Sequence, residues 1–252
     1  MILLNFTKKS LLVTLLISLL VFTSLMVVAQ DSEPTEDSEP TVLATVNGED
    51  ITDQELSSAA QVYPIIMTLS QQYRSFAQFL ISSPAGSEFL SEYRKYVLDQ
   101  LIDEKLKQQK VEEMDIGVSD EEVQAEIDNI IENNEQFGDE QALEDYLKNE
   151  QNMSMDNLKS MIKENLRSEK LTEEVTSGVE VSEEEVKAYY ESNEQSFTDD
   201  EGNVKPFEEV EGQIESNLLS EKENQVYNEW MEKVREEAEV TKNEENLNEE
   251  NL

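Results

Sequence analysis

The sequence contains no cysteine and no histidine among its 252 residues. The absence of cysteine excludes thiol nucleophiles, disulfides and thiolate zinc sites. The absence of histidine excludes imidazole acid–base chemistry and Ser-His-Asp or Cys-His arrangements. Most classes of enzyme are therefore disfavoured. A chain without cysteine suits an extracytoplasmic location, where free thiols form unwanted disulfides, although it does not establish that location.

Positive charge is scarce as well, because 19 Lys and Arg residues face 58 Asp and Glu residues and the formal net charge is -39. Such a chain repels phosphate backbones and anionic lipid surfaces, so we expect no nucleic-acid partner and no broad membrane contact. Cationic and apolar partners stay open. The composition is typical of an exposed protein adapted to concentrated salt or high pH, since self-repulsion of this size destabilises a fold unless it is screened.

The many carboxylates give little sign of chemistry. The residue types present are compatible with hydrolysis by a pair of carboxylates, but with 58 acidic residues such pairs occur by chance on every helix. The acidic run around Asp199 lacks the ligand spacing of an EF-hand loop and is interpreted as a turn. We therefore expect no catalytic residue, no metal and no cofactor.

The first 29 residues read as an export signal, in which Lys8 and Lys9 precede an uncharged run from Leu11 to Ala29. The run is also just long enough to span a bilayer, so residues 1–29 are either a cleaved signal peptide or an N-terminal membrane anchor. Residues 30–40 repeat an acidic phrase with two prolines and predict a disordered linker. Residues 242–252, which include Asn-Glu-Glu-Asn-Leu written twice, predict an acidic disordered tail.

The best-defined helical signal runs from Tyr96 to Ile131. Apolar residues recur there at spacings of three and four, and the first helix should stop near Gly117. Ser119 and Glu122 then form a capping box for a second helix, and the same pattern recurs at Thr52 with Glu55 and at Ser182 with Glu185. Further helices are expected over 139–148, 155–176 and 207–238, with a polar interval at 220–225 that either bridges two lobes or is merely solvated.

A short strand is expected over Thr41–Val46, followed by a turn at Asn47-Gly48. A single strand needs a partner, and the best one downstream is the segment Ala238–Thr241. The two ends of the domain should therefore meet. Between them, residues 56–90 are expected to form two helices, broken at Ser83-Pro84-Ala85-Gly86.

This order of elements resembles the chaperone portion of the SurA and PrsA foldases. The resemblance is carried by motifs in this order along the chain: a strand with Val-Asn-Gly, then Leu-Ile-Asp-Glu-Lys-Leu, Gly-Val-Ser-Asp-Glu-Glu-Val, Phe-Gly and Val-Ser-Glu-Glu-Glu-Val-Lys-Ala-Tyr-Tyr. The resemblance covers Val42 to Thr241 and is strongest over Val97–Ile127 and Val179–Phe197. It implies a mainly α, multi-helix chaperone domain over residues 41–241, SurA N-terminal-like or trigger-factor-like, with a small β pairing of the N- and C-terminal segments.

This sequence also differs from the SurA and PrsA foldases in one respect. In those foldases the Tyr-Tyr helix is commonly followed by parvulin isomerase domains, whereas here only residues 198–205 separate it from the helix that Pro206 introduces. We therefore expect the isomerase domain to be absent, and the chain lacks the histidines that parvulin sites generally use.

Residues 56–90 hold more apolar and aromatic surface than one buried stripe needs. They form either a thick core helix or a wall that grips unfolded polypeptide with adaptable side chains. For the second interpretation the candidate binding residues are Tyr63, Met67, Tyr73, Phe76, Phe79 and Phe89.

The function favoured by these observations is an exported, bacterial holdase chaperone that binds unfolded extracytoplasmic polypeptides without isomerase activity. The alternatives are a peptidyl-prolyl isomerase of the SurA and PrsA family and a helical scaffold or assembly protein of the envelope.

Overall fold

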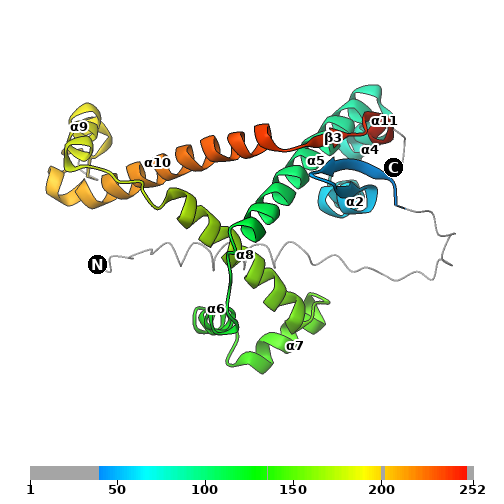
Figure 1. Ribbon diagram of the computed structural model, residues 1–252, viewed down its shortest axis with the longest axis horizontal. Helices are drawn as coiled ribbons and strands as arrows, with labels where there is room; N and C mark the ends of the chain where they lie inside the picture. The colour runs from blue at the N-terminus through cyan, green and yellow to red at the C-terminus, as the bar shows by residue number, and fades with distance from the viewer. Residues whose placement is uncertain (1–39, 135, 200–201, 249–252) are drawn as a thin grey trace. The chain divides into compact units, whose positions relative to one another are not determined.

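The computed structural model of the chain describes residues 40–134, 136–199 and 202–248 (Figure 1). The expected signal or anchor and nearly all of the expected linker lie outside these residues. The described residues form two compact units. The first unit comprises the described residues of Met1–Ser168 and Glu239–Leu252, and the second comprises those of Glu169–Ala238.

A three-stranded antiparallel sheet brings the two ends of the first unit together. The central strand β1 (Val42–Val46) pairs with β2 (Glu49–Thr52) on one side and with β3 (Val240–Lys242) on the other. The turn between β1 and β2 places Asn47 at φ 50° and Gly48 at φ 89°, the left-handed conformations that an Asn-Gly hairpin uses. The predicted pairing of the two ends is therefore confirmed, whereas β2 was not foreseen.

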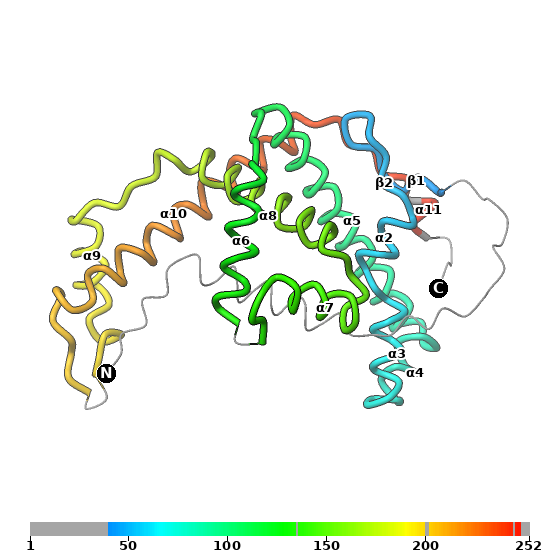
Figure 2. The backbone as a smooth tube through the Cα atoms, turned by 90° about the horizontal axis from the view of Figure 1, so that it is seen from below, coloured from blue at the N-terminus to red at the C-terminus, as the bar shows by residue number. Residues whose placement is uncertain are grey.

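The C-terminal residues differ from the expected tail. β3 extends to Lys242, and α11 (Glu244–Asn248) follows it beside β1 (Figure 2). The side chain of Leu247 is only 7% exposed. Residues 243–248 are thus part of the fold, because the apolar Leu247 finds a surface to cover, and the expectation of a tail from residue 242 is wrong for them.

Four helices follow β2 in the sequence. They are α2 (Asp53–Ala60), α3 (Val62–Gln72), α4 (Arg74–Ser82) and α5 (Pro84–Glu113). The predicted break before Pro84 is present, but three helices, α2, α3 and α4, precede it instead of the one expected there. The additional breaks lie at Gln61, which adopts φ 48°, and at Tyr73, which adopts φ -131° and ψ 56°. The break at Tyr73 is marked by neither glycine nor proline, whereas Pro64 lies in the first turn of α3, just after the break at Gln61.

Helix α5 supports both the sheet and the neighbouring helices. Buried residues recur along it at Leu90, Val97, Leu98, Ile102, Leu106 and Val111. At the sheet end, the Gln109 side-chain amide donates hydrogen bonds to the Val46 carbonyl oxygen at 3.1 Å and to Glu49 Oε1 at 2.7 Å. The hairpin is thereby fixed on the helix.

The remaining helices of the first unit surround their own core. They are α6 (Asp120–Glu132), α7 (Glu140–Glu150) and α8 (Met155–Thr176), the last of which has the bounds predicted from the sequence and continues into the second unit. The fully or nearly buried core side chains include Ile127, Ile130, Leu143, Leu147, Leu158 and Ile162. The predicted capping box of Ser119 and Glu122 is present at the start of α6.

The second unit pairs α9 (Glu183–Asn193) and a 3-10 turn (Glu194–Ser196) with the long helix α10 (Phe207–Glu237). Val186, Val210 and Ile214 form its buried core. The polar interval of α10 has a local partner, because Lys222 Nζ donates to the Glu180 carbonyl oxygen at 3.0 Å and to Glu185 Oε1 at 2.6 Å. An interrupted apolar stripe is thus compensated by an ion pair to the start of α9.

Candidate functional site

One segment of this strongly acidic chain carries no acidic residue. Residues 56–87 contain no Asp or Glu and a single cation, Arg74. They form most of α2, all of α3 and α4 and the first residues of α5. The charge that covers the rest of the chain is therefore missing from one continuous set of helices, which directs attention to their surface.

Helix α4 is held against the start of α5 by a close backbone approach. Ala77 and Leu80 are buried. A Cβ added at Gly86 would lie 2.4 Å from the Phe79 carbonyl oxygen and 2.5 Å from the Leu80 carbonyl oxygen, so no other residue fits there without a backbone shift. The Ser83 hydroxyl accepts a hydrogen bond from the Gly86 N–H at 3.0 Å and caps α5.

Helix α3 is held much more loosely. All of its residues are described, and none of its side chains is buried. The aliphatic hydroxyls of Thr68 and Ser70 are occupied within the helix, because Thr68 Oγ1 donates to the Pro64 carbonyl oxygen at 3.0 Å and Ser70 Oγ donates to the Ile66 carbonyl oxygen at 2.8 Å. What α3 offers to its surroundings is mainly apolar surface.

The candidate binding residues predicted from the sequence lie on this surface. Their exposed fractions run from 42% for Met67 to 75% for Tyr63. The interpretation of these six residues as parts of a thick core is therefore wrong. Large exposed apolar side chains that cluster on neighbouring helices are typical of a surface that contacts other molecules.

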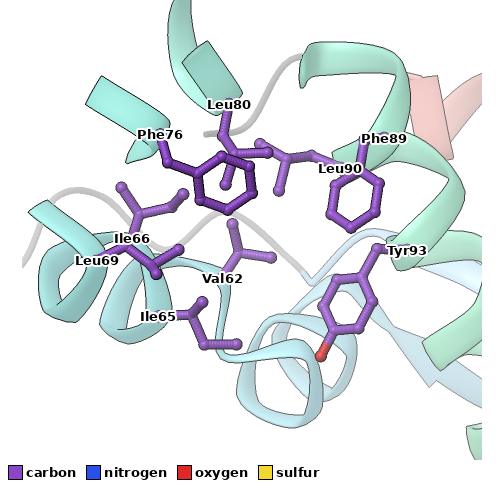
Figure 3. A pocket seen from close by; sticks show the side chains of 9 residues that line it. All are labelled: Val62, Ile65, Ile66, Leu69, Phe76, Leu80, Phe89, Leu90 and Tyr93. Atoms are coloured by element: carbon purple, nitrogen blue, oxygen red, sulfur yellow. The ribbon is translucent and has the colours of Figure 1, made fainter. Parts of the chain in front are cut away.

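Between α3, α4 and α5 lies an open cavity of about 280 Å³, which we name the apolar groove (Figure 3). It is lined by Val62, Ile65, Ile66, Leu69, Phe76, Leu80, Phe89, Leu90 and Tyr93. In Figure 3 these side chains converge from the three helices on a common space. The one polar side-chain atom among them, Tyr93 Oη, donates a hydrogen bond to the Ala60 carbonyl oxygen at 3.1 Å.

Two of the six predicted residues, Phe76 and Phe89, line the apolar groove. The other four are exposed but are not among its lining residues. The sequence prediction missed Val62, Ile65, Ile66, Leu69, Leu80, Leu90 and Tyr93 as members of the site. The spacing of Val62, Ile66 and Leu69 by four and three residues is a helical stripe that could have revealed one wall.

The chemistry available in the apolar groove is burial of apolar surface. Its lining contains no acid, base or nucleophile other than the engaged tyrosine hydroxyl. Burial of apolar surface contributes roughly 25 cal/mol per Å², so a few large side chains placed in the groove bind usefully without any directed polar contact. Across the described residues, no group of three or more acidic side chains is arranged to hold a metal ion.

The connection between α9 and α10 closes tightly in the second unit. Lys205 N donates to the Phe197 carbonyl oxygen at 2.7 Å, and Tyr190 Oη donates to the Lys205 carbonyl oxygen at 2.6 Å. Burial, with Glu194 and Glu208 nearby, raises the pKa of Tyr190, which keeps this hydroxyl protonated as a donor. The ends of the connection are thus fixed close together.

The fold is that of the SurA-like chaperones. A solved chain from Campylobacter jejuni, reported in work on PEB4 and the periplasmic protein Cj1289 as two structurally related SurA-like chaperones, matches with a TM-score of 0.56. The match has 15% sequence identity and covers 80% of this chain and 98% of that chain. The expected fold, mainly α with a small sheet that joins the two ends, is confirmed.

The chain belongs to the family described as the SurA-like N-terminal domain, whose family model matches residues 2–172. It is 30% identical to the foldase protein PrsA of Clostridium botulinum strain Loch Maree over 159 aligned residues. The aligned region covers 62% of this chain and 46% of that protein. It is 29% identical over 157 residues to the foldase protein PrsA of Caldanaerobacter subterraneus, 44% of whose length is covered. The chain therefore spans less than half the length of these relatives.

The resemblance to the SurA and PrsA foldases that the sequence predicted is confirmed by these matches. Of the helices that the structure describes, none combines the length and the apolarity required to cross a membrane.

Proposed function

We propose that this protein is an extracytoplasmic chaperone of the holdase type, which binds unfolded or partly folded exported polypeptides, here called clients, and has no isomerase activity. The observation that carries the proposal is the apolar groove with its exposed flank, Tyr63, Met67, Tyr73 and Phe79, in the acid-free segment. An open apolar surface in a chain of net charge -39 offers unfolded polypeptides a place to bury side chains.

The family supports the chaperone part of this proposal. Both relatives compared above carry the name foldase, and the solved structure is described among SurA-like chaperones. The extracytoplasmic location is proposed on the same grounds, together with the export-like N-terminal sequence. Whether that segment is cleaved or retained decides between a released protein and an anchored one.

The proposed lack of isomerase activity rests on the connection between α9 and α10. Only residues 198–205 stand there, and their ends are fixed by the hydrogen bonds of Lys205 and Tyr190. Uncatalysed proline isomerisation takes tens to hundreds of seconds, so a catalyst is easily detected in a refolding reaction that is limited by this step. We expect catalytic amounts of the protein to leave that rate unchanged, and an acceleration would support the isomerase alternative.

The holding activity is tested with an unrelated protein that aggregates on dilution from denaturant. We expect an excess of the chaperone to delay the aggregation, and we expect Phe76→Ser and Phe89→Ser to reduce the delay while helix content and melting temperature are kept. The matched control is Tyr96→Ser, which removes an aromatic side chain of α5 that is 62% exposed and does not line the groove. Unchanged holding by both groove variants would contradict the proposed site.

A further inference from the structure

The charge of the chain is distributed very unevenly between the segment that forms most of the apolar groove and the rest of the sequence. Residues 56–87 carry one positive charge, whereas the whole chain carries a formal -39, so the remaining residues carry -40. Eight of the nine lining residues are in or within three residues of this acid-free segment, and the ninth, Tyr93, follows shortly after it. The groove is therefore an uncharged surface on a strongly acidic chain.

The interior of the groove has nothing with which to pair a charged group. Its lining is aliphatic and aromatic, and its tyrosine hydroxyl already donates to the Ala60 carbonyl oxygen. A client carboxylate or ammonium group placed there would lose water without gaining a partner. Only the apolar part of a client segment fits inside, and its charged residues stay at the edge.

At the edge, the charged residues next to lining residues in the sequence are Glu88, Glu92 and Arg94. Glu92 forms an ion pair with Lys95 at 2.8 Å, and Arg74 lies two positions before Phe76. Glu88, directly before Phe89, is exposed. Arg74, Arg94 and Lys95 against Glu88 and Glu92 leave a net charge of only +1. The other described residues of the first unit outside residues 56–87 hold 26 Asp and Glu against 8 Lys and Arg, a net charge of -18, so the unit that carries the groove is strongly negative.

From this distribution we propose that the apolar groove selects client segments in which an apolar core is flanked by lysine or arginine, and that it rejects the same core when it is flanked by acidic residues. The inference rests on the proposed chaperone function and names its class of client. Charge complementarity carries it, since flanking cations are attracted by the excess of carboxylates in the first unit and flanking carboxylates are repelled.

The selection depends on salt in a defined way. The Debye length is about 10 Å at 0.1 M salt and about 3 Å at 1 M salt, so the effect of charges outside the groove is largely screened at the higher concentration. Burial of the apolar core is not screened. In concentrated salt the groove therefore binds apolar segments with little regard to the charge of their flanks.

The test uses three labelled peptides with one apolar core and two Lys, two Gln or two Glu at each end. Their binding to the full chain is measured by fluorescence anisotropy at 0.1 M and 1 M salt. We expect the Lys-flanked peptide to bind on the order of tenfold more tightly than the Glu-flanked peptide at 0.1 M, with the Gln-flanked peptide between them, and the difference to shrink below about threefold at 1 M.

Two controls separate selection at the groove from general attraction to an acidic protein. A peptide with the same Lys flanks and serines in place of the apolar core should bind at least about tenfold more weakly than the complete peptide. Phe76→Ser and Phe89→Ser should weaken the complete Lys-flanked peptide, whereas Tyr96→Ser should not. Unchanged binding of that peptide to both groove variants would show that it binds elsewhere on the acidic surface and would overturn the inference.

The remaining outcomes distinguish this inference from the proposed function. If the Gln-flanked peptide binds in the groove and the Lys- and Glu-flanked peptides bind equally well at 0.1 M salt, the charge selection is wrong and the chaperone function stands. If no peptide binds and no aggregating client is held, the proposed function itself fails.

Discussion

The side-chain amide of Asn243 donates a hydrogen bond to the carbonyl oxygen of Val42 at 3.0 Å, across a separation of 201 residues. The Asn246 side-chain amide donates to the same oxygen at 3.0 Å. The first strand of the described chain is therefore fixed by the segment that follows its last strand. The groove-bearing helices lie between these two ends in the sequence, so closure of the ends helps to hold their scaffold.

Removal of the Leu247 side chain should weaken this closure. Leu247 is 7% exposed in α11. Replacing a buried Leu by Ala lowers the free energy of unfolding by about 2 kcal/mol at the lower end of the usual range, and we take this lower end because α11 is a short terminal helix. Leu247→Ala should therefore lower the free energy of unfolding of the first unit by roughly that amount, as measured by denaturant titration. Glu245→Ala, an exposed change in the same helix, is the matched control, and equal effects of the two would contradict the packing of α11.

Two glycines in long helices should respond to alanine in opposite ways. At Gly86 the new Cβ would meet backbone atoms of α4 at 2.4 to 2.6 Å, so Gly86→Ala should destabilise the helices of the groove by about 1–3 kcal/mol. At Gly212, in α10, the new Cβ has no atom within 4 Å, so Gly212→Ala should stabilise α10 by about 0.5–1 kcal/mol. Thermal unfolding followed by circular dichroism compares the two variants with the parent protein, and stabilisation by Gly86→Ala would refute the close approach.

Helix α3 should open more readily than its neighbours. It has no buried side chain, whereas α5 contains buried residues at Leu98, Ile102 and Leu106. Local opening needs less free energy where fewer apolar contacts are lost. In native-state hydrogen exchange, the amides of α3 should therefore exchange at least about tenfold faster than those around Leu98. Equal protection of the two helices would show that α3 is held by contacts other than burial.

The pair of Glu185 and Lys222 predicts a dependence on pH in the second unit. The hydrogen bond from Lys222, followed by those from Ser182, lowers the pKa of Glu185 from 4.5 to about 2. Because the folded state favours the ionised carboxylate, this contribution to stability is fully present above pH 4.5 and is lost as the pH falls towards 2. Glu185 is exposed, so solvent screening keeps the contribution small.

The measurement for this pair is the stability of the parent protein relative to Glu185→Gln, taken at pH 6 and near pH 2. The advantage of the parent protein should shrink at the lower pH. Glu184→Gln removes a neighbouring carboxylate that lacks the Lys222 contact and reports the general effect of charge loss. A difference between parent and Glu185→Gln that grows as the pH falls would contradict the assigned pair.

Local signals in the sequence predicted the helix starts well. The three capping boxes at Thr52, Ser119 and Ser182 are all present, since each depends only on a residue and its third neighbour. Helix α8 has the predicted bounds because its apolar stripe is long and regular. The meeting of the two ends was also predicted, from the need of β1 for a partner and from the family resemblance.

The sequence predictions of secondary structure and burial were wrong where contacts between distant residues determine the structure. β2 has the sequence Glu-Asp-Ile-Thr, in which only Ile51 is buried, so no alternation of apolar residues marked it as a strand. The break at Tyr73 lacks the glycine or proline that usually ends a helix. Leu247 looks solvated in an acidic repeat, and its burial becomes visible only when the ends of the chain are brought together.

The candidate site was predicted in part for a similar reason. An excess of aromatic residues indicated a binding surface, and all six chosen residues are exposed. Which of them line a cavity depends on how α3, α4 and α5 pack, and this packing is set by Gly86 and by the unmarked break at Tyr73. Composition therefore identified the surface, and tertiary packing defined the groove.

The most direct test of the central claim is to crosslink an unfolded client to single cysteines in this cysteine-free chain. Phe76→Cys and Phe89→Cys place the thiol in the apolar groove, and Tyr96→Cys places it on an exposed part of α5 that does not line the groove. After attachment of a photoreactive group, the groove variants should crosslink the client strongly, Tyr96→Cys weakly, and excess apolar peptide should reduce the groove crosslinks. Equal crosslinking at all three positions, or none in the groove while the protein still holds the client, would contradict the claim that clients bind there.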